Sequence, residues 1–478
     1  MSRKILAAAV AAVAAVLTSI PAPAAPGLFD GNLDLGRPGE DPKLPGGVTE
    51  SGGVYRVTGG GSDWWDGGEF GHFVYKSVSG PFRIEANVTP IDDGTMDWWA
   101  KMGVAVRNDI ATGAGNEKEV NYYTAVSGTA RDVDNHAAYF QYRNDATQNM
   151  VSQEYKWWKE VTPGTWGTVK AQKVALERFS FGGKQFVASY ADFGEGGGWT
   201  KVGASVATNL NNNVYVGLAV TSHNNDATEA VDFSNVSFGT PSLTVGSVPT
   251  GKRLTADLGA VTNPGLKIRT IRDARTDHAG WGYGQMNELL DTGAIGGTPG
   301  ADAGVRVDPV VNLYDSDGAG AFNNGNGKAD RTFPGIDAFG TNPANPADGD
   351  NDDNFATEVT GYIALTAGEH VIGINSDDGA ILKIGGVEVG RTGEWKGTSN
   401  EDVLFTVAEP GVYAFELRAI EGGGGASLEI HDFDGASRAL LGEGTIVIGQ
   451  TLVPEPASLG LLLAGSAVAA GLRRRRRA

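Results

Sequence analysis

The chain of 478 residues contains no cysteine. This absence excludes disulfide bonds, thiolate zinc sites, iron–sulfur clusters and cysteine nucleophiles together. Basic residues are also in the minority, because 38 Lys and Arg stand against 57 Asp and Glu, which gives a formal net charge of −19. An acidic surface repels a phosphate backbone, so we expect no nucleic-acid partner.

Sustained helical periodicity is also missing from about 53–239, and in the second region the stretch Met286 to Leu290 suggests a single helical turn. Short runs of alternating apolar and polar residues occupy about 53–239, for example 82–88 and 102–107, and a second set occupies about 264–433. Period-two alternation between turn residues is typical of β-strands, and 71 glycines provide turns. We therefore predict an all-β protein with two antiparallel, jelly-roll-like β-sandwich domains.

Changes of composition divide the chain into segments. Gly- and Pro-rich or polar stretches separate the strand-rich regions, as expected for linkers. The predicted organisation is a signal peptide at 1–24, a first domain at 27–239, a linker at 240–263, a second domain at 264–433 with an acidic insertion at 315–354, a spacer at 434–452 and a sorting segment at 453–478.

The N-terminus predicts export. Arg3 and Lys4 precede an apolar run that ends in the small-residue pattern Ala22-Pro23-Ala24. A positive start, an apolar core and a small-x-small cleavage site define a secretory signal peptide. A first transmembrane anchor is the alternative.

The C-terminus has three parts, which are Pro454-Glu455-Pro456, an apolar run at 457–472 and a cluster of arginines that begins with Arg473 and Arg474. A helix of this length spans about 24 Å, which is short of the roughly 30 Å hydrocarbon core. The tripartite pattern resembles the PEP-CTERM sorting signal of Gram-negative bacteria. That resemblance implies an exosortase-type sorting peptidase, transient inner-membrane contact through a transmembrane helix, and a final location at the cell surface or in the extracellular matrix. A plain tail anchor is the alternative.

The first region is rich in tryptophan, with adjacent pairs that include Trp64 and Trp65. Neighbours on a strand point to opposite faces, so one Trp can anchor the core while the other stacks on a sugar ring. The order of elements from this pair to the closing run 230–236 resembles concanavalin-A-like (laminin-G-like) lectin and glucanase domains. We take Trp64 and Trp65 as a candidate carbohydrate platform, with core packing as the alternative.

The second region contains a hairpin around Ser376-Asp377-Asp378-Gly379, in which Asp-Gly is a strong turn signal. This hairpin and the strands that follow resemble the protective-antigen-type β-sandwich, named for the anthrax toxin component. The resemblance implies that Asp377 and Asp378 bind Ca²⁺, that the ion contacts glycan hydroxyls, and that Trp395 lies nearby. A structural hairpin whose Asp side chains cap backbone N–H groups is the alternative.

The acidic insertion carries Asp at alternate positions, a spacing that lets carboxylates converge in a tight loop. Calcium is therefore a candidate cofactor here too, and a solvated acidic loop is the alternative. The candidate ligands are Asp315, Asp317, Asp348, Asp350 and Asp352.

Catalytic signatures are missing. The chain has no Gly-x-Ser-x-Gly, no His-Glu-x-x-His and no Glu-x-Asp-x-x-Glu of jelly-roll glucanases. The sequence thus favours an exported, non-catalytic protein that binds extracellular polysaccharide or another glycan. The alternatives are a glycoside hydrolase acting on matrix polysaccharide and a structural matrix protein without a discrete ligand.

Overall fold

The computed structural model describes residues 27–453, except for 92–93, 128–136, 156, 163–164, 204, 243–244, 276–280, 315–330, 337–352 and 435–436. The predicted signal peptide and the sorting segment lie outside these residues. So do the acids predicted in the insertion, from Asp315 to Asp352. Within the described part, none of the helices combines the length and the apolar character that a membrane crossing requires.

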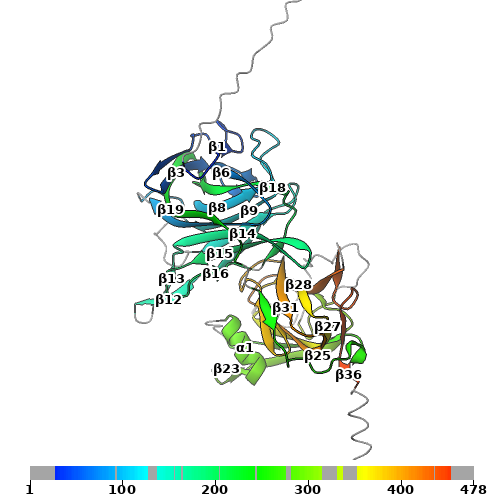
Figure 1. Ribbon diagram of the computed structural model, residues 1–478. Helices are drawn as coiled ribbons and strands as arrows, with labels where there is room; N and C mark the ends of the chain where they lie inside the picture. Colours follow the sequence, from blue (N-terminus) through cyan, green and yellow to red (C-terminus); the bar gives the residue numbers. More distant parts are fainter. Residues whose placement is uncertain are drawn as a thin grey trace, which may run out of the picture.

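The first domain is a sandwich of two antiparallel sheets (Figure 1). One sheet has the order β1 (Gly31–Leu35), β6 (Gly71–Ser79), β18 (Asn213–Thr221), β8 (Lys101–Arg107), β9 (Asn121–Ser127), β10 (Ala138–Arg143) and β11 (Val151–Tyr155). The opposite sheet has the order β16 (Thr200–Lys201), β15 (Lys184–Asp192), β14 (Lys173–Phe181), β7 (Phe82–Ile91), β19 (Asn224–Gly239), β3 (Val54–Gly61) and β2 (Gly47–Ser51), with β17 (Val206–Ala207) also on β15. Two hairpins stand apart, β4 (Trp64–Trp65) with β5 (Gly68–Glu69) and β12 (Trp157–Thr162) with β13 (Thr165–Val169).

The second domain is also a two-sheet sandwich. One sheet has the order β20 (Gly246–Val248), β31 (Ser399–Val407), β28 (Gly368–Asp377), β33 (Ser427–Asp434) and β26 (Asn312–Tyr314), with β34 (Ser437–Leu440) on β33. The other has the order β25 (Ala301–Asp308), β22 (Leu266–Arg272), β27 (Phe355–Leu365), β32 (Gly411–Glu421), β29 (Ala380–Ile384) and β30 (Val387–Arg391), with β35 (Val447–Gly449) on β27. The short pairs are β21 (Val261–Thr262) with β36 (Thr451–Leu452) and β23 (Ala294–Ile295) with β24 (Thr298–Pro299), and η1 (Leu258–Ala260) precedes β21.

The alternating pattern explains both cores. In β7, Phe82, Ile84 and Val88 are buried against the facing sheet, while Glu85 and Asn87 between them are only half-buried. In β27, Val359 and Ile363 face the second core in the same way. The prediction of an all-β fold with two β-sandwiches is confirmed.

One α-helix, α1 (Tyr283–Thr292), is described, where the sequence suggested a single turn. Met286, Leu289 and Leu290 are buried and pack in a small apolar cluster with Ile381 and Ile420 of the adjacent sheet. The helix ends at Gly293, whose φ of 75° lies in the left-handed region that glycine adopts readily.

The segments on either side of the second domain belong to its sheets. Within the predicted linker 240–263, β20 pairs in parallel with β31, through Val248 and Val407, and β21 pairs with β36, which lies in the predicted spacer 434–452. Within the same spacer, β35 pairs with β27. These linker and spacer strands have only two or three residues, too few to show a periodic pattern; the sheets that they join stabilise them.

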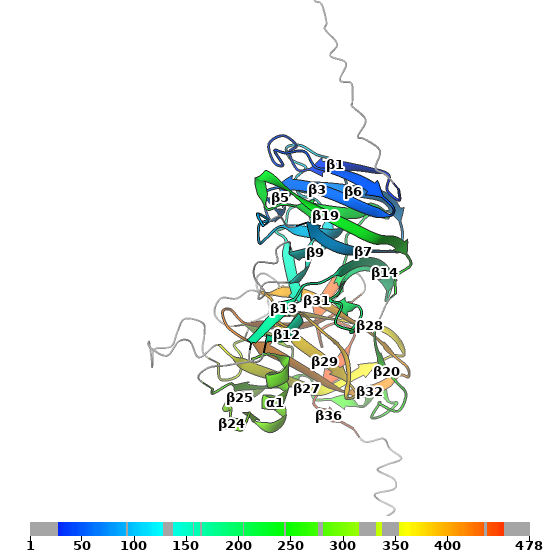
Figure 2. The same ribbon diagram turned by 90° about the vertical axis from the view of Figure 1, so that its left-hand side faces the viewer.

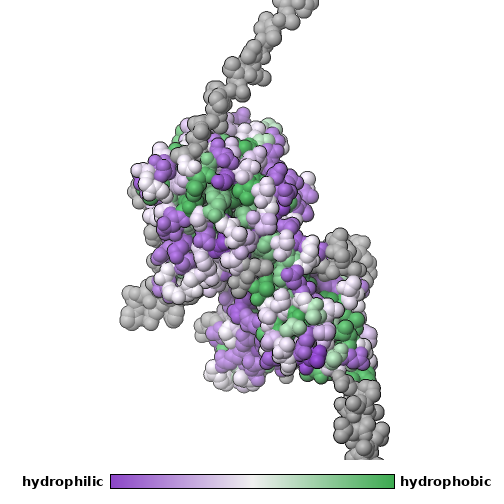
Figure 3. Space-filling model, viewed as in Figure 1, coloured by the Kyte–Doolittle hydropathy of each residue, from purple (hydrophilic) through white to green (hydrophobic). Residues whose placement is uncertain are grey.

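The two sandwiches stack end to end, and the molecule has two lobes joined at a waist (Figures 1, 2 and 3). An apolar cluster crosses the waist, with Phe179 and Phe186 from the first domain and Val371 and Leu404 from the second. The backbone N–H of Asp402 also donates to the Ser205 carbonyl at 3.0 Å. The contact therefore has both an apolar and a polar component.

Candidate functional site

The Asp377–Asp378 turn lies at the end of β28. That strand pairs with β31 on one side and β33 on the other; its last residue, Asp377, lies opposite Ser427 of β33, while the pairing with β31 ends one residue earlier, at Ser376. The peptide bond between Asp377 and Asp378 is cis. After the turn the chain enters β29, which pairs with β32 through Ala380 and Ala419.

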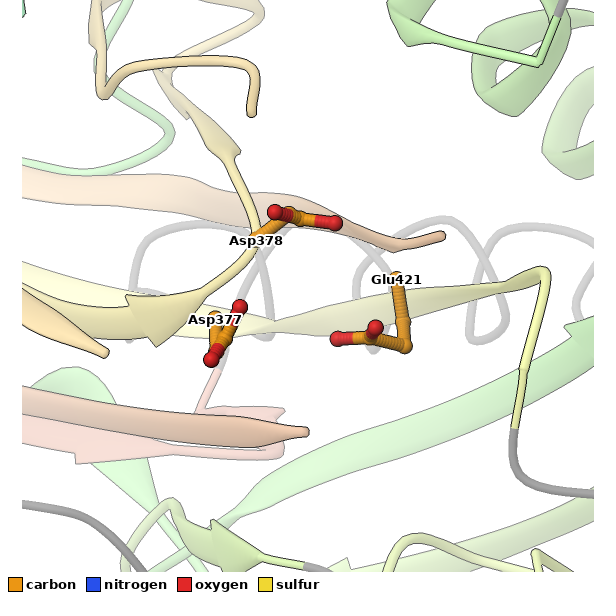
Figure 4. A group of neighbouring side chains, drawn as sticks. All are labelled: Asp377, Asp378 and Glu421. Carbon is orange, nitrogen blue, oxygen red and sulfur yellow. The ribbon is translucent and has the colours of Figure 1, made fainter. Parts of the chain in front are cut away.

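This register brings a third acid to the turn. The Asp378 N–H donates to the Ile420 carbonyl at 3.2 Å, so Glu421, the last residue of β32, lies beside Asp378. One carboxylate oxygen from each of Asp377, Asp378 and Glu421 lies within 4.8 Å of the others. Figure 4 shows the three side chains gathered around a common space, and we call them the acidic triad.

Two members of the acidic triad are buried, Asp378 at 7% exposure and Glu421 at 1%. Backbone N–H groups bind both oxygens of Asp378, from Lys396 at 2.9 Å and from Gly422 at 3.1 Å. Asp377 accepts from the Thr398 N–H at 3.0 Å. Neither oxygen of Glu421 accepts a hydrogen bond of normal geometry from a described residue, which leaves a buried acceptor group unsatisfied.

The pKa values reflect this crowding. Burial, followed by the charges of Asp378 and Asp377, raises the pKa of Glu421 to about 10, and the nearby Gly423 N–H offsets little of this. Burial also raises the pKa of Asp378 to about 7, with a further contribution from Asp377 and an opposing one from its two backbone hydrogen bonds and Lys396. Like charges in a desolvated space disfavour ionisation, so the acidic triad is a place where a cation would be stabilised.

Lys396 is a buried cation beside the acidic triad, and its charge interacts with Asp377 and Asp378. Its ammonium donates to the Ser376 carbonyl and lies 3.8 Å from Glu401. Burial lowers the pKa of Lys396, while Glu401 and the two Asp residues oppose that shift. Lys396 therefore shares its charge between Glu401 and the two Asp residues of the acidic triad, and the pKa values of Asp378 and Glu421 stay raised beside it.

Trp395 lies next to the acidic triad and is 40% exposed. A Cβ atom added at Gly422 would stand 2.4 Å from the Trp395 ring and 3.3 Å from an Asp378 oxygen. The indole therefore packs on the Gly422 backbone beside the Asp378 carboxylate. The structure thus brings together Asp377, Asp378 and Trp395, all three of which the sequence analysis selected in this region.

Sequence reasoning missed Glu421 and the loop that follows it. Glu421 precedes the four glycines 422–425, and in this loop the Gly424 N–H donates to Asp353 at 3.0 Å. An acid that ends a strand directly before a glycine run was the available signal. Asp353 itself adjoins the insertion acids that were predicted as ligands, which lie outside the described residues.

The first domain corrects one prediction. Trp64 is fully buried, its ring lies 4.9 Å from that of Tyr123, and its indole N–H donates to Asn121 at 3.1 Å. Trp64 is therefore a core residue and cannot form a surface platform, while Trp65 is half-buried. Among the tryptophans of this domain whose side chains the structure describes, Trp98 and Trp99 are exposed, at 53% and 54%.

No protein-family model matches the chain, and no curated protein matches it. Among solved structures, the chain is similar to the PA14 sugar-binding domain of an RTX adhesin, with 20% identity, a TM-score of 0.27 and coverage of 38% of this chain and 96% of that one. It is also similar to the Epithelial Adhesin 9 A domain of Candida glabrata in complex with Galb1-3GlcNAc, with 12% identity, a TM-score of 0.27 and coverage of 45% and 99%. A third is the PA14 domain of the MpAFP antifreeze protein, with 14% identity, a TM-score of 0.28 and coverage of 40% and 94%. These likenesses are too loose to carry an argument about function.

Proposed function

We propose that this protein is an exported carbohydrate-binding protein, and that it holds Ca²⁺ at the acidic triad of Asp377, Asp378 and Glu421. The observation that carries the proposal is the convergence of three carboxylates within 4.8 Å, two of them buried. A buried group of acids whose charge is only partly offset is costly for a fold to keep. A bound divalent cation removes that cost.

The donor set fits calcium by its chemistry. Ca²⁺ takes six to eight oxygen ligands, commonly carboxylates, carbonyls and waters. The acidic triad offers carboxylate oxygens only, and both Glu421 oxygens lack a hydrogen-bond donor among the described residues. When bound, the ion would supply open coordination positions for vicinal sugar hydroxyls.

Trp395 would supply the second half of the recognition. A flat aromatic ring matches the apolar C–H face of a pyranose, and Trp also carries a polar N–H. The ring rests on Gly422, directly beside the Asp378 carboxylate. One sugar could therefore contact the ion through its hydroxyls and the indole through its ring face.

The termini complete the proposal. A signal peptide at 1–24 and a sorting segment with Pro454, Glu455, Pro456, Arg473 and Arg474 would place the protein at the surface or in the extracellular matrix of a Gram-negative bacterium. The partners would be extracellular polysaccharide, the export machinery and an exosortase-type peptidase. Millimolar extracellular calcium suits even a modest site.

A glycoside hydrolase at the acidic triad is the competing function. Such enzymes need one carboxyl to donate a proton and another to attack or activate water. Both oxygens of Asp378 already accept backbone N–H groups, which fits a fixed ligand better than a reacting group. The geometry therefore favours binding.

A glycan array with the full chain tests the proposal, with Ca²⁺ and with EDTA. We expect binding that EDTA abolishes and that Asp378→Ala and Glu421→Gln both remove. Asp226→Asn is the matched control, because Asp226 is an exposed acid of the first domain, with 76% of its side chain accessible. Absence of all glycan binding in Ca²⁺ would overturn the proposal, and calorimetric titration with Ca²⁺ would show separately whether the metal site exists.

A further inference from the structure

The segment that leads into β8 of the first domain makes a tight turn with two tryptophans at its tip. The Ala100 N–H donates to the Asp97 carbonyl at 3.2 Å, so 97–100 is a β-turn with Trp98 and Trp99 at its two central positions. The Asp97 side chain accepts the Trp99 N–H at 2.8 Å, as an aspartate at the first position of a turn commonly does. Met96 and Ala100 are buried, so the turn is anchored at both ends.

The two indole rings at this tip are open to solvent. Trp98 and Trp99 are 53% and 54% exposed. Among the described residues, no aromatic ring stacks on either indole and no cation lies over it. Turns of this kind favour Pro, Asp, Asn, Ser and Gly, whose backbone preferences or short polar side chains suit the bend. Two tryptophans contribute neither, so the turn itself does not explain their presence.

A histidine fixes the base of the turn. Nδ1 of His223 lies 2.9 Å from the Asp97 carboxylate, and its Nε2 lies 3.7 Å from the Asp63 carboxylate. Lys101 donates to Asp63 at 2.5 Å from the other side. His223 has a φ of 54°, in the left-handed region where a residue other than glycine is strained. Strained residues of this kind cluster at ligand-binding sites.

Hydrogen-bonding groups are available beside the rings. The side chains of Asp97 and His223 are 40% and 32% exposed. The Trp99 N–H and His223 both contact Oδ1 of Asp97, which leaves its Oδ2 to accept from a ligand. His223 Nε2 is too far from Asp63 for a hydrogen bond and can pair with a ligand hydroxyl. Flat apolar faces beside such groups match a pyranose, which has an apolar C–H face and a rim of hydroxyls.

We propose that the turn 97–100 is a second binding site, which takes a chain of neutral polysaccharide. Asp97 is the most exposed charged side chain at the base of the turn, since Asp63 is 23% and Lys101 only 4% exposed. Its carboxylate would repel a polyanion, which favours a neutral chain. Two rings at the tip of a turn cannot enclose a short glycan. The ligand is therefore an extended chain that lies across the ring faces.

This site does not depend on the acidic triad. The turn belongs to the first domain, whereas Asp377, Asp378 and Glu421 belong to the second. The carboxylates beside the turn already have partners in Lys101 and His223, so no cation is needed to hold them. Binding at the turn should therefore persist without calcium.

Depletion of the full chain from solution by insoluble cellulose, chitin, curdlan or mannan, in EDTA, tests the proposal. We expect binding to at least one of these polymers, and Trp98→Ala and Trp99→Ala should each weaken it about fivefold or more. Trp98→Phe should retain more binding than Trp98→Ala, because it keeps a ring face. Trp395→Ala is the matched control, since it removes an exposed ring of the second domain and should leave this binding unchanged. Unchanged thermal unfolding would confirm that the variants fold.

Absence of binding to all four polymers in EDTA would overturn the proposal, and so would binding that both turn variants leave unchanged. Trp98-dependent binding to phosphatidylcholine vesicles, or Trp98-dependent dimers in sedimentation, without polymer binding would assign the turn to a membrane surface or to a second copy instead. Asp378→Asn separates the two sites, because it should abolish calcium-dependent glycan binding and leave the EDTA-resistant polymer binding intact. Failure of the turn and failure of the acidic triad are thereby distinguished.

Discussion

Two buried acids, Glu69 in the first domain and Glu421 in the second, have opposite electrostatic surroundings. In the first domain, Glu69 is fully buried and lies in ion-pair contact with Arg107, at 2.9 Å, and with Arg143. Asn121 also donates to it at 2.9 Å. In the second domain, the neighbours of buried Glu421 are two further acids, Asp377 and Asp378.

The pKa contributions show the same contrast. Burial raises the pKa of Glu69, while the charges of Arg107 and Arg143 lower it again. Burial also raises the pKa of Glu421, and the neighbouring charges of Asp378 and Asp377 raise it further. A buried carboxylate alone therefore does not indicate a binding site; the sign of the charges around it distinguishes a structural ion pair from a candidate metal site.

Replacing the buried Glu69 of the first domain should have the largest effect on stability. Glu69→Gln leaves the buried guanidinium groups of Arg107 and Arg143 without their carboxylate, which should cost about 3–5 kcal/mol. The measurement is calorimetric unfolding of the full chain, with the transition of each domain followed separately. Glu421→Gln is the matched control and should cost less than about 1 kcal/mol in EDTA. If both variants lost the same free energy of unfolding, the different surroundings of Glu69 and Glu421 would have no effect on stability.

Calcium should stabilise only the second domain. At a Ca²⁺ concentration near 100 times the Kd, a ligand that binds only the folded state adds about 2.7 kcal/mol. We expect this gain in the wild type and no gain in Asp378→Asn, as measured by the shift of the second transition with Ca²⁺. A gain confined to the first domain would contradict the assignment of the metal site.

The stability of the calcium-free second domain should depend on pH through Glu421. Its folded-state pKa is raised to about 10, against an ordinary value of 4.5, so the folded state keeps a proton that the unfolded state loses. The contribution of Glu421 to stability is therefore largest below about pH 4.5 and is lost as the pH rises toward 10, by up to about 1.4 kcal/mol per pH unit. Denaturant unfolding in EDTA at pH 6 and pH 8 should show the wild type losing stability relative to Glu421→Gln. Parallel pH profiles of the two proteins would contradict the raised pKa.

The sequence allowed most of the fold to be predicted, because long strands such as β7 and β27 show their alternating pattern directly. The shorter strands β20 and β35 were not assigned to a sheet, since three residues carry no periodicity. The Trp64–Trp65 pair indicated one inward and one outward ring. Alternation cannot tell which ring is which, and the hydrogen bond to Asn121 shows that Trp64 faces inward.

The candidate site was predictable only in part. Asp377 and Asp378 are adjacent in the sequence, so a single motif indicates both. Glu421 reaches them only through the register of β29 against β32, which places Ala380 opposite Ala419. A contact that depends on strand register between distant segments leaves no local pattern to read.

The smallest predicted effect concerns the aromatic surface, and it again compares the two domains. Trp395→Ala should weaken calcium-dependent glycan binding about tenfold, since an aromatic contact contributes roughly 0.5–1.5 kcal/mol beyond its buried area.

Gly422→Ala should act in the same direction, because its Cβ would overlap the Trp395 ring, and Gly422 does not have the positive φ that would strain alanine. Calcium affinity should change little in Trp395→Ala, as measured by calorimetry. The matched control is Trp99→Ala in the first domain, where the ring is 54% exposed and lies in a different domain from the acidic triad. Loss of calcium-dependent binding in that control would show that exposed tryptophan alone, and not its place beside the acidic triad, determines recognition.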